Sequence, residues 1–119
     1  FNIVARNQDD HVKNIAFRMD RQGKWSLSPA FDVIYSFNPD GAWTSQHQMT
    51  MNAKRDHFTQ ADFEACAKSC SMQRGRAKSI LDEVKQTVEN WSDFAQQAGV
   101  DERNQERIKS QFRLEIPAR

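Results

Sequence analysis

The stretch TQADFEACAKSCSMQRGRAKSILDEVKQTVENW, residues 59–91, carries the strongest helical pattern of the chain. Thr59 followed by Asp62 is a variant of the capping box, in which a hydroxyl and a carboxylate satisfy the free N–H groups at a helix start. Apolar residues recur at i, i+3, i+4 and i+7 on both sides of Gly75, which interrupts the pattern only weakly. The stretch therefore predicts an amphipathic helical region.

The helical pattern continues toward the C-terminus. Gly99 is expected to end the stretch that begins at Trp91, and Asp101 is expected to cap a third helix. Ile108 and Phe112 are predicted to face inward from that helix. We expect Arg113 to lie on an exposed, salt-bridged face, because acidic residues balance the basic ones in this segment.

The first 57 residues lack this helical pattern and are rich in turn-forming residues. Two short apolar stretches, 15–19 and 25–27, flank Asp20-Arg-Gln-Gly23, which is typical of the connection in a β-hairpin. The sequence thus predicts an α+β fold, mostly helical. It predicts one domain, with an irregular segment and hairpin over residues 1–57 and three helices over residues 58–119.

The charge of the 119-residue chain is nearly balanced, with 17 Lys and Arg against 16 Asp and Glu and a net charge of +1. No segment is strongly cationic, so we expect no direct contact with nucleic acid. No apolar run approaches the roughly 20 residues that cross a bilayer, so we expect no membrane contact. The chain begins with Phe1 inside an apolar pattern, which predicts a cut through a larger protein.

The sequence also predicts the burial or exposure of several side chains outside the main motifs. His47 and His57 match no zinc pattern and are expected to be exposed, and Cys66 and Cys70 are expected to be small buried thiols. Trp25 and Trp91 are expected in the core and Trp43 is expected to be partly exposed. The basic residues Arg74, Arg76 and Lys78 are predicted to form a solvated helix start.

The densest polar cluster is NQDDHVKN, residues 7–14, directly before the hairpin. A solvated turn would also have this composition, but the order of the residues favours chemistry. Asp9 and Asn14 are five residues apart, and Asp32 follows the hairpin. An Asp in this arrangement can accept the proton of an attacking hydroxyl, while an Asn oxygen and a second carboxylate hold Mg²⁺ against nucleotide phosphates.

The two motifs NQDDHVKN, residues 7–14, and LSPAFDV, residues 27–33, resemble the catalytic and metal-binding stretch of HipA-family toxin kinases. The family pattern is roughly Asp-x-His-x-Lys-Asn followed by Leu-(Ser/Thr)-Pro-x-(Tyr/Phe)-Asp. Both parts are present without a gap. The resemblance is sharp over about residues 1–35, and the helical remainder is compatible with the large, C-terminal lobe of a protein-kinase-like fold.

The resemblance implies roles for six residues. Asp9 would be the catalytic base, and Asn14 and Asp32 would bind Mg²⁺. His11 and Lys13 would support the loop or approach the ATP phosphates. The ring of Phe31, next to Asp32, would border the nucleotide. The spacing of the family pattern selects Asp9 as the base, and Asp10 is then expected to be a solvated carboxylate.

The resemblance also implies a biological setting. It implies a cytoplasmic serine/threonine protein kinase of a bacterial type II toxin–antitoxin system, with ATP and Mg²⁺ as cofactors. The implied partners are a HipB-like DNA-binding antitoxin and a protein substrate such as an aminoacyl-tRNA synthetase or another translation factor. The four glycines are scattered, and no glycine-rich loop precedes the catalytic segment. We therefore expect this chain to be inactive without an N-terminal lobe.

Two other classes of function remain open from the residues alone. A metal-dependent phosphoesterase or nuclease could use Asp9, Asp10, His11 and Asp32 around paired metals. A non-catalytic interaction module could use the polar loop and the helices as a binding surface. The intact order of Asp9 and Asn14 argues against the phosphoesterase.

Overall fold

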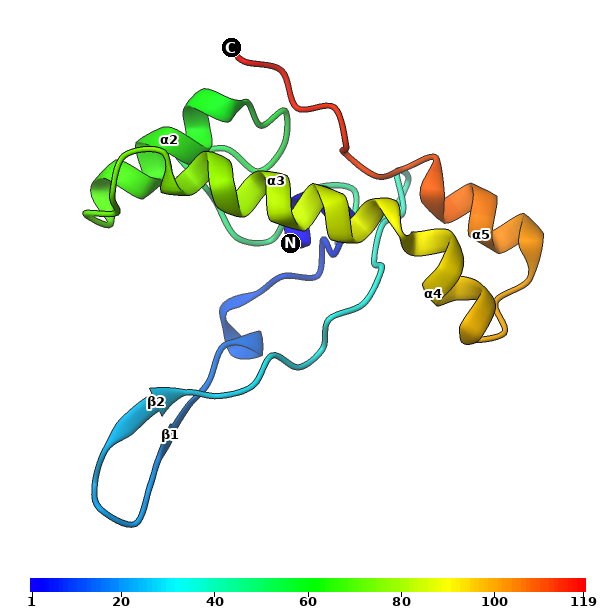
Figure 1. Ribbon diagram of the computed structural model, residues 1–119. Helices are drawn as coiled ribbons and strands as arrows, with labels where there is room; N and C mark the ends of the chain where they lie inside the picture. The colour runs from blue at the N-terminus through cyan, green and yellow to red at the C-terminus, as the bar shows by residue number, and fades with distance from the viewer.

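The computed structural model describes residues 1–119 and shows a helical body from which a β-hairpin projects (Figure 1). The helices are α1 (Asn2–Ala5), α2 (Gln60–Ser69), α3 (Arg76–Glu89), α4 (Trp91–Gln97) and α5 (Glu102–Lys109), with a 3-10 turn over Val12–Asn14. The strands are β1 (Phe17–Met19) and β2 (Trp25–Leu27). The α+β class and the hairpin near the N-terminus are confirmed, and the kinase-like lobe stays a prediction.

The predicted capping box begins α2. The Asp62 carboxylate accepts hydrogen bonds from the Thr59 backbone N–H at 2.7 Å and from its hydroxyl at 2.9 Å. The same carboxylate, buried in the structure, also accepts from Asn52 Nδ2 and Lys54 Nζ, each at 2.7 Å. The helix start is therefore tied to the irregular segment that precedes it.

The prediction of three helices after residue 58 is wrong, because the structure has four. Gly75 adopts φ 83° and separates α2 from α3, which then pack against each other. A positive φ of this size is open to glycine at little cost, so the residue reverses the chain direction rather than interrupting one helix weakly. Gly99, at φ 72°, follows α4, and Asp101 caps α5 by accepting a 3.0 Å hydrogen bond from the Asn104 backbone N–H, as predicted.

The hydrophobic core joins the two ends of the chain to α3. Val4 and Ala5 of α1, Leu81 and Val88 of α3, and Ile116 near the C-terminus form one buried cluster. Helix α1 was not predicted from the sequence, because four residues are too few to show a helical period. Its position matters for the site, because the polar cluster 7–14 begins two residues after it ends.

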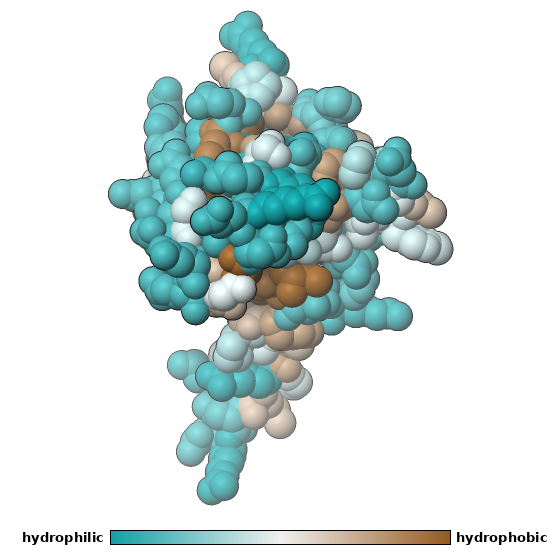
Figure 2. Space-filling view, turned by 90° about the vertical axis from the view of Figure 1, so that its right-hand side faces the viewer, coloured by the Kyte–Doolittle hydropathy of each residue, from teal (hydrophilic) through white to brown (hydrophobic).

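The hairpin packs only on itself. In the antiparallel register Phe17 pairs with Leu27 and Met19 pairs with Trp25. All four side chains are exposed, so the prediction that Trp25 lies in the core is wrong. Figure 2 shows that hydrophobic atoms gather where the hairpin joins the helical body. The hairpin therefore presents an apolar surface that no other part of this chain covers.

Other side-chain expectations were confirmed or corrected by the structure. Trp43 is exposed, as predicted. Trp91 is half-buried rather than in the core, and its ring packs edge-on against Phe112. The sequence predicts two buried thiols, but Cys66 is only half-buried and Cys70 is exposed. Burial of Cys66, together with its neighbour Cys70, raises the pKa of the Cys66 thiol.

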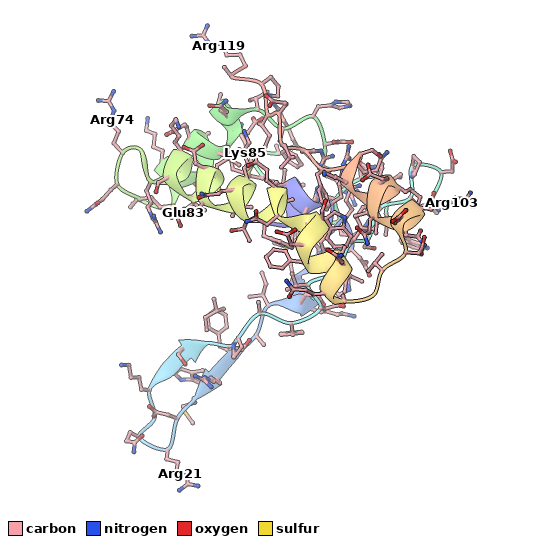
Figure 3. All side chains as sticks on the ribbon, turned by 45° about the vertical axis from the view of Figure 1, so that its right-hand side comes forward. Arg21, Arg74, Glu83, Lys85, Arg103 and Arg119 are labelled. Carbon is pink, nitrogen blue, oxygen red and sulfur yellow. The ribbon has the colours of Figure 1, made fainter.

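The basic side chains are spread over the molecule. Figure 3 shows Arg21 at the tip of the hairpin, Arg74 between α2 and α3, and Arg103 on α5, each pointing away from the body. At the start of α3, Arg76 pairs with Glu83 and Lys78 pairs with Asp82 on the exposed surface, which confirms the predicted solvated helix start. None of the helices has both the length and the apolar character needed to cross a membrane.

Candidate active site

The polar loop is held at its start by the segment that follows the hairpin. Arg6 ends α1 in the left-handed conformation, at φ 58°. The Gln8 N–H donates to the Ser36 carbonyl at 2.9 Å, and the Ser36 N–H donates to the Arg6 carbonyl at 3.0 Å. The Gln8 side chain is fully buried and donates from Nε2 to the Thr44 carbonyl at 3.0 Å. This short parallel pairing brings the chain after the hairpin alongside the polar loop.

Asn7 joins the loop to Asp32. Its Nδ2 donates to the Asp32 carbonyl at 3.1 Å and to Asn2 Oδ1 at 3.3 Å. Its Oδ1 is buried and has no hydrogen-bond partner. Asp32 adopts φ 53°, a conformation that only a few residue types besides glycine occupy readily and that often occurs at functional sites. The contact with Asn7 therefore fixes the backbone of Asp32 while its carboxylate stays exposed.

Asn14 closes the polar loop from its other end. The 3-10 turn brings the side chain back, so that Asn14 Nδ2 donates to the Asp9 carbonyl at 3.2 Å. Because the amide nitrogen is used in this bond, Oδ1 is the atom of Asn14 that stays free to bind a ligand. The Asp9 carboxylate accepts no hydrogen bond from the chain, and the side chain is half-buried. The structure thus brings Asp9 and Asn14 together as the sequence predicted.

Asp10 has a different environment from Asp9, and the prediction that it is a solvated carboxylate is wrong. Its side chain is buried and accepts hydrogen bonds from His47 Nδ1 at 2.8 Å and from the backbone N–H groups of Gln48 at 2.8 Å and Met49 at 3.3 Å. Burial alone raises the pKa of this carboxyl, but the hydrogen bonds from His47 and the two amides outweigh it and lower the pKa below its usual value. Asp10 is therefore a saturated, structural carboxylate.

The other three predicted residues form no side-chain hydrogen bond or ion pair within the chain. Lys13 is exposed within the 3-10 turn, and Phe31 is 44% exposed next to Asp32. His11 is half-buried, and its Nδ1 is a buried nitrogen without a hydrogen-bond partner. Together with Asn7 Oδ1, it leaves two unpaired polar atoms in the same short loop. Unpaired buried polar atoms are rare in folded proteins and call for a functional or structural explanation.

The residues present fit a magnesium ion. Mg²⁺ prefers hard oxygen ligands and needs only one or two protein oxygens beside nucleotide phosphates and water. Asn14 Oδ1 and the Asp32 carboxylate are oxygens that no group of the chain uses. No three His, Cys, Asp or Glu side chains are grouped closely enough to hold a metal ion by themselves. These two free oxygens are of the kind that Mg²⁺ prefers beside phosphates, and they do not form a closed protein cage.

A separate apolar cavity of about 470 Å³ lies between α1, α2, α3 and the segment 49–51. Asp10 and His47 border it at one end, but none of the six predicted site residues does.

His47 is fully buried, so the expectation that it is exposed is wrong, whereas His57 is exposed as predicted. His47 contacts Arg113, which is half-buried and does not lie on an exposed face.

Sequence reasoning missed this contact because His47 lies 37 residues from Asp10 and 66 residues from Arg113. No local pattern could have connected these three residues. The one available signal was Asp10 itself, because a second carboxylate directly after Asp9 is not needed to form a solvated turn.

Comparison with known proteins identifies the family of most of the chain. Residues 1–92 match the family model described as HipA-like C-terminal domain, which includes the loop, the hairpin and helices α1 to α3. Neither the curated proteins nor the solved structures gave a match. Since the matched segment covers more than half of the chain, the chain belongs to the family of HipA-like C-terminal domains.

Proposed function

We propose that this chain supplies the catalytic loop and the metal site of an ATP-dependent serine/threonine protein kinase. The observation that carries the proposal is the loop that Asn14 closes. The hydrogen bond from Asn14 Nδ2 to the Asp9 carbonyl leaves both the Asp9 carboxylate and Asn14 Oδ1 free. Asp32 adds a third free oxygen group beside the same loop, because Asn7 binds its carbonyl.

Each free group has a part in phosphoryl transfer. Asp9 accepts the proton of the substrate hydroxyl as that oxygen bonds to the γ-phosphorus of ATP and the bond from the γ-phosphorus to the β,γ-bridging oxygen breaks, which releases ADP. Asn14 Oδ1 and the Asp32 carboxylate would hold Mg²⁺, which would neutralise charge on the phosphates. The base and the metal ligands are separate residues, so the Asp9 carboxylate does not have to coordinate the metal and can accept a proton.

His11, Lys13 and Phe31 are proposed to act on the nucleotide. The unpaired Nδ1 of His11 offers a hydrogen-bonding atom inside the loop, and the exposed Lys13 offers a positive charge for phosphate oxygens. The exposed ring of Phe31 provides an apolar surface next to Asp32. Family membership supports a toxin of a type II toxin–antitoxin system, with a HipB-like DNA-binding antitoxin as partner. The protein substrate is proposed to be an aminoacyl-tRNA synthetase or another translation factor.

The test is transfer of the labelled γ-phosphate of ATP to protein by the full-length protein. We expect Asp9→Asn to lower kcat by at least about a hundredfold, because a positioned general base contributes roughly 10²–10⁴-fold. The melting temperature should not change, since the Asp9 carboxylate makes no hydrogen bond in the chain. The matched control is Asp40→Asn, an exposed loop carboxylate that should leave both quantities unchanged. Transfer by the Asp9→Asn protein at the wild-type rate would contradict the proposal.

The structure weighs against the phosphoesterase alternative. That mechanism needs free oxygens on Asp10 as well as on Asp9 to hold paired metals. In the structure, however, Asp10 uses both carboxylate oxygens for His47 and for backbone amides. A ligand set that included Asp10 would have to break these buried hydrogen bonds. The kinase arrangement uses only groups that the fold leaves free.

A further inference from the structure

The Asp10 carboxylate anchors the chain immediately after the proposed catalytic residue. It is held by His47 Nδ1 on one oxygen and by the backbone N–H groups of Gln48 and Met49 on the other. Asp10 is buried, and hydrogen bonds to a buried carboxylate are among the stronger ones in proteins. The segment 47–49 therefore fixes the backbone of the loop at a point one residue from Asp9.

The contacts of His47 define its protonation state. Its ring is fully buried, with Nδ1 at 2.8 Å from Asp10 Oδ2 and Nε2 at 2.9 Å from Arg113 Nη1. An arginine guanidinium has only donors, so Nε2 must accept and cannot carry a proton. The single ring proton is then on Nδ1, where it is donated to Asp10. Arg113 thus selects the one neutral tautomer of His47 that can bind Asp10.

Arg113 comes from the far end of the chain and is itself held in place. Its backbone N–H donates to the Val4 carbonyl at 2.9 Å, and its Nη1 donates to the Ile3 carbonyl at 3.2 Å. Its Nη2 also forms an ion pair with Asp56. The guanidinium stays charged because Asp56 opposes the lowering of its pKa by burial and by Arg6. The segment after α5 is thereby tied to α1, to segment 47–57 and, through His47, to the polar loop.

Asp9 lies between two fixed points of this network. Before it, Gln8 is buried and bonded through its backbone to Ser36. After it, Asp10 is bonded to His47, and the Asp9 carbonyl accepts from Asn14. The Asp9 carboxylate has no partner of its own, so these neighbours determine where it lies. A displacement of about 1 Å of a catalytic group can cost roughly a hundredfold in rate.

We propose that the hydrogen bond from His47 Nδ1 to Asp10 positions Asp9 for catalysis, so that His47 is a positioning residue of the reaction, and that Arg113 acts by selecting the tautomer of His47 that makes this bond. The inference rests on the proposed function, because it assigns a catalytic role to Asp9. A purely structural role makes a different prediction, namely that any variant keeping the same stability keeps the same activity per folded molecule.

Two substitutions of His47 in the full-length protein separate these roles. In His47→Asn, the amide nitrogen replaces Nδ1 and can still donate to Asp10, but the contact with Arg113 is lost. In His47→Gln, the amide oxygen replaces Nε2 and can still accept from Arg113, but the contact with Asp10 is lost. Each variant keeps one of the two buried hydrogen bonds, so we expect similar decreases in melting temperature.

Phosphate transfer is then measured per folded molecule. We expect His47→Gln to lower kcat by at least about tenfold and His47→Asn by no more than about threefold, since only the former releases Asp10. The KM for Mg·ATP should stay within about twofold of the wild type in both variants, because neither touches Asn14 or Asp32. Equal kcat values for the two variants would overturn the positioning role while leaving the proposed kinase activity intact. Absence of transfer by the wild-type protein would overturn both.

A measurement on the wild-type protein covers the case in which the variants do not fold. Nitrogen-15 NMR of the histidine ring distinguishes a protonated from an unprotonated ring nitrogen. We expect His47 to carry its proton on Nδ1 and none on Nε2 at neutral pH. A proton on Nε2 would be incompatible with the bond from Arg113 and would overturn the proposal.

Discussion

The loop-and-hairpin region, residues 7–36, and the helical region, residues 58–116, use similar residues in opposite ways. In the hairpin, Leu27 is 62% exposed, whereas Leu81 of α3 is buried at 6% exposure in the core cluster. The carboxylates differ in the same way. Asp32 leaves its carboxylate free in the first region, whereas Asp62 uses its carboxylate fully in the second. The exposed groups of the first region are therefore free of contacts within the chain, whereas the corresponding groups of the second region stabilise the fold.

A polar side chain without a partner indicates a ligand site only when the backbone around it is held in place. Asp32 is exposed, but its backbone is held in a strained conformation by Asn7. Asp40 is also exposed, but its backbone N–H is held only by Asn38 within the same surface turn. Restraint of the backbone together with freedom of the side chain is what distinguishes a ligand group from a solvated one. Matched substitutions in the two regions test this contrast.

The largest effect is expected from a matched pair of leucines. We expect Leu81→Ala to lower the free energy of unfolding by about 3 kcal/mol, because it removes buried methyl groups and leaves a cavity in the core. Leu27→Ala should cost less than about 0.5 kcal/mol, because the side chain is exposed on the hairpin. Denaturant unfolding of both variants measures the two values. Equal losses would contradict the contrast and would mean that the hairpin face is covered in the full-length protein.

The second prediction concerns the carboxylate that begins α2. Asp62→Ala should destabilise the protein by about 2 kcal/mol, because it removes a helix cap and leaves the buried partners of the carboxylate unpaired. Asp82→Ala is the matched control in α3, where the ion pair with Lys78 is exposed and should contribute less than about 0.5 kcal/mol. Thermal unfolding followed by circular dichroism compares the two. A smaller loss at Asp62 than at Asp82 would show that the cap does not stabilise α2.

Acid dependence gives the Asp62 prediction a second measurement. Hydrogen bonds from Lys54 and Asn52 hold the pKa of the Asp62 carboxyl well below its usual value. Because the folded pKa lies below the unfolded value of about 3.9, the stabilisation is complete above that pH and is lost as the pH falls through the folded pKa. Below about pH 4, the wild-type protein should therefore lose stability more steeply than Asp62→Ala. Parallel pH profiles would rule out this role of the carboxylate.

Local features of the fold were predictable from the sequence, and long-range ones were not. The Thr59 and Asp62 cap and the hairpin turn depend on residues within a few positions of each other, so their spacing alone indicates them. The break at Gly75 was underestimated, because the apolar period continues on both sides of it and does not show the direction of the chain. Trp25 falls on an apolar face, which predicts a place in the core, but the sequence does not show what covers that face.

In the candidate site, too, local features were predictable from the sequence and long-range contacts were not. The motif order placed Asp9 and Asn14 in one loop with Asp32 after the hairpin, and the structure joins Asp9 and Asn14 through a hydrogen bond. The spacing of the motif selects Asp9 and leaves Asp10 as a solvated carboxylate, because it cannot show the partner His47, which lies 37 residues away in a segment without regular structure. A buried polar network of this kind has no periodic pattern, so only the folded structure can identify it.

The smallest effect on the free energy of unfolding is expected at Asp32, where the change should appear in nucleotide binding instead. Asp32→Asn should weaken the binding of Mg·ATP to the full-length protein by about tenfold, because it removes a negative charge from the metal ligands while keeping an amide oxygen. Asparagine tolerates the left-handed conformation at φ 53°, and the Asp32 carbonyl that binds Asn7 is retained, so the melting temperature should not change. Isothermal titration calorimetry measures the affinity, with Asp40→Asn as the control. Because Asp40 is also exposed but is held only within its own surface turn, a similar loss of affinity at both positions would mean that general surface charge, and not a positioned ligand, attracts the metal nucleotide.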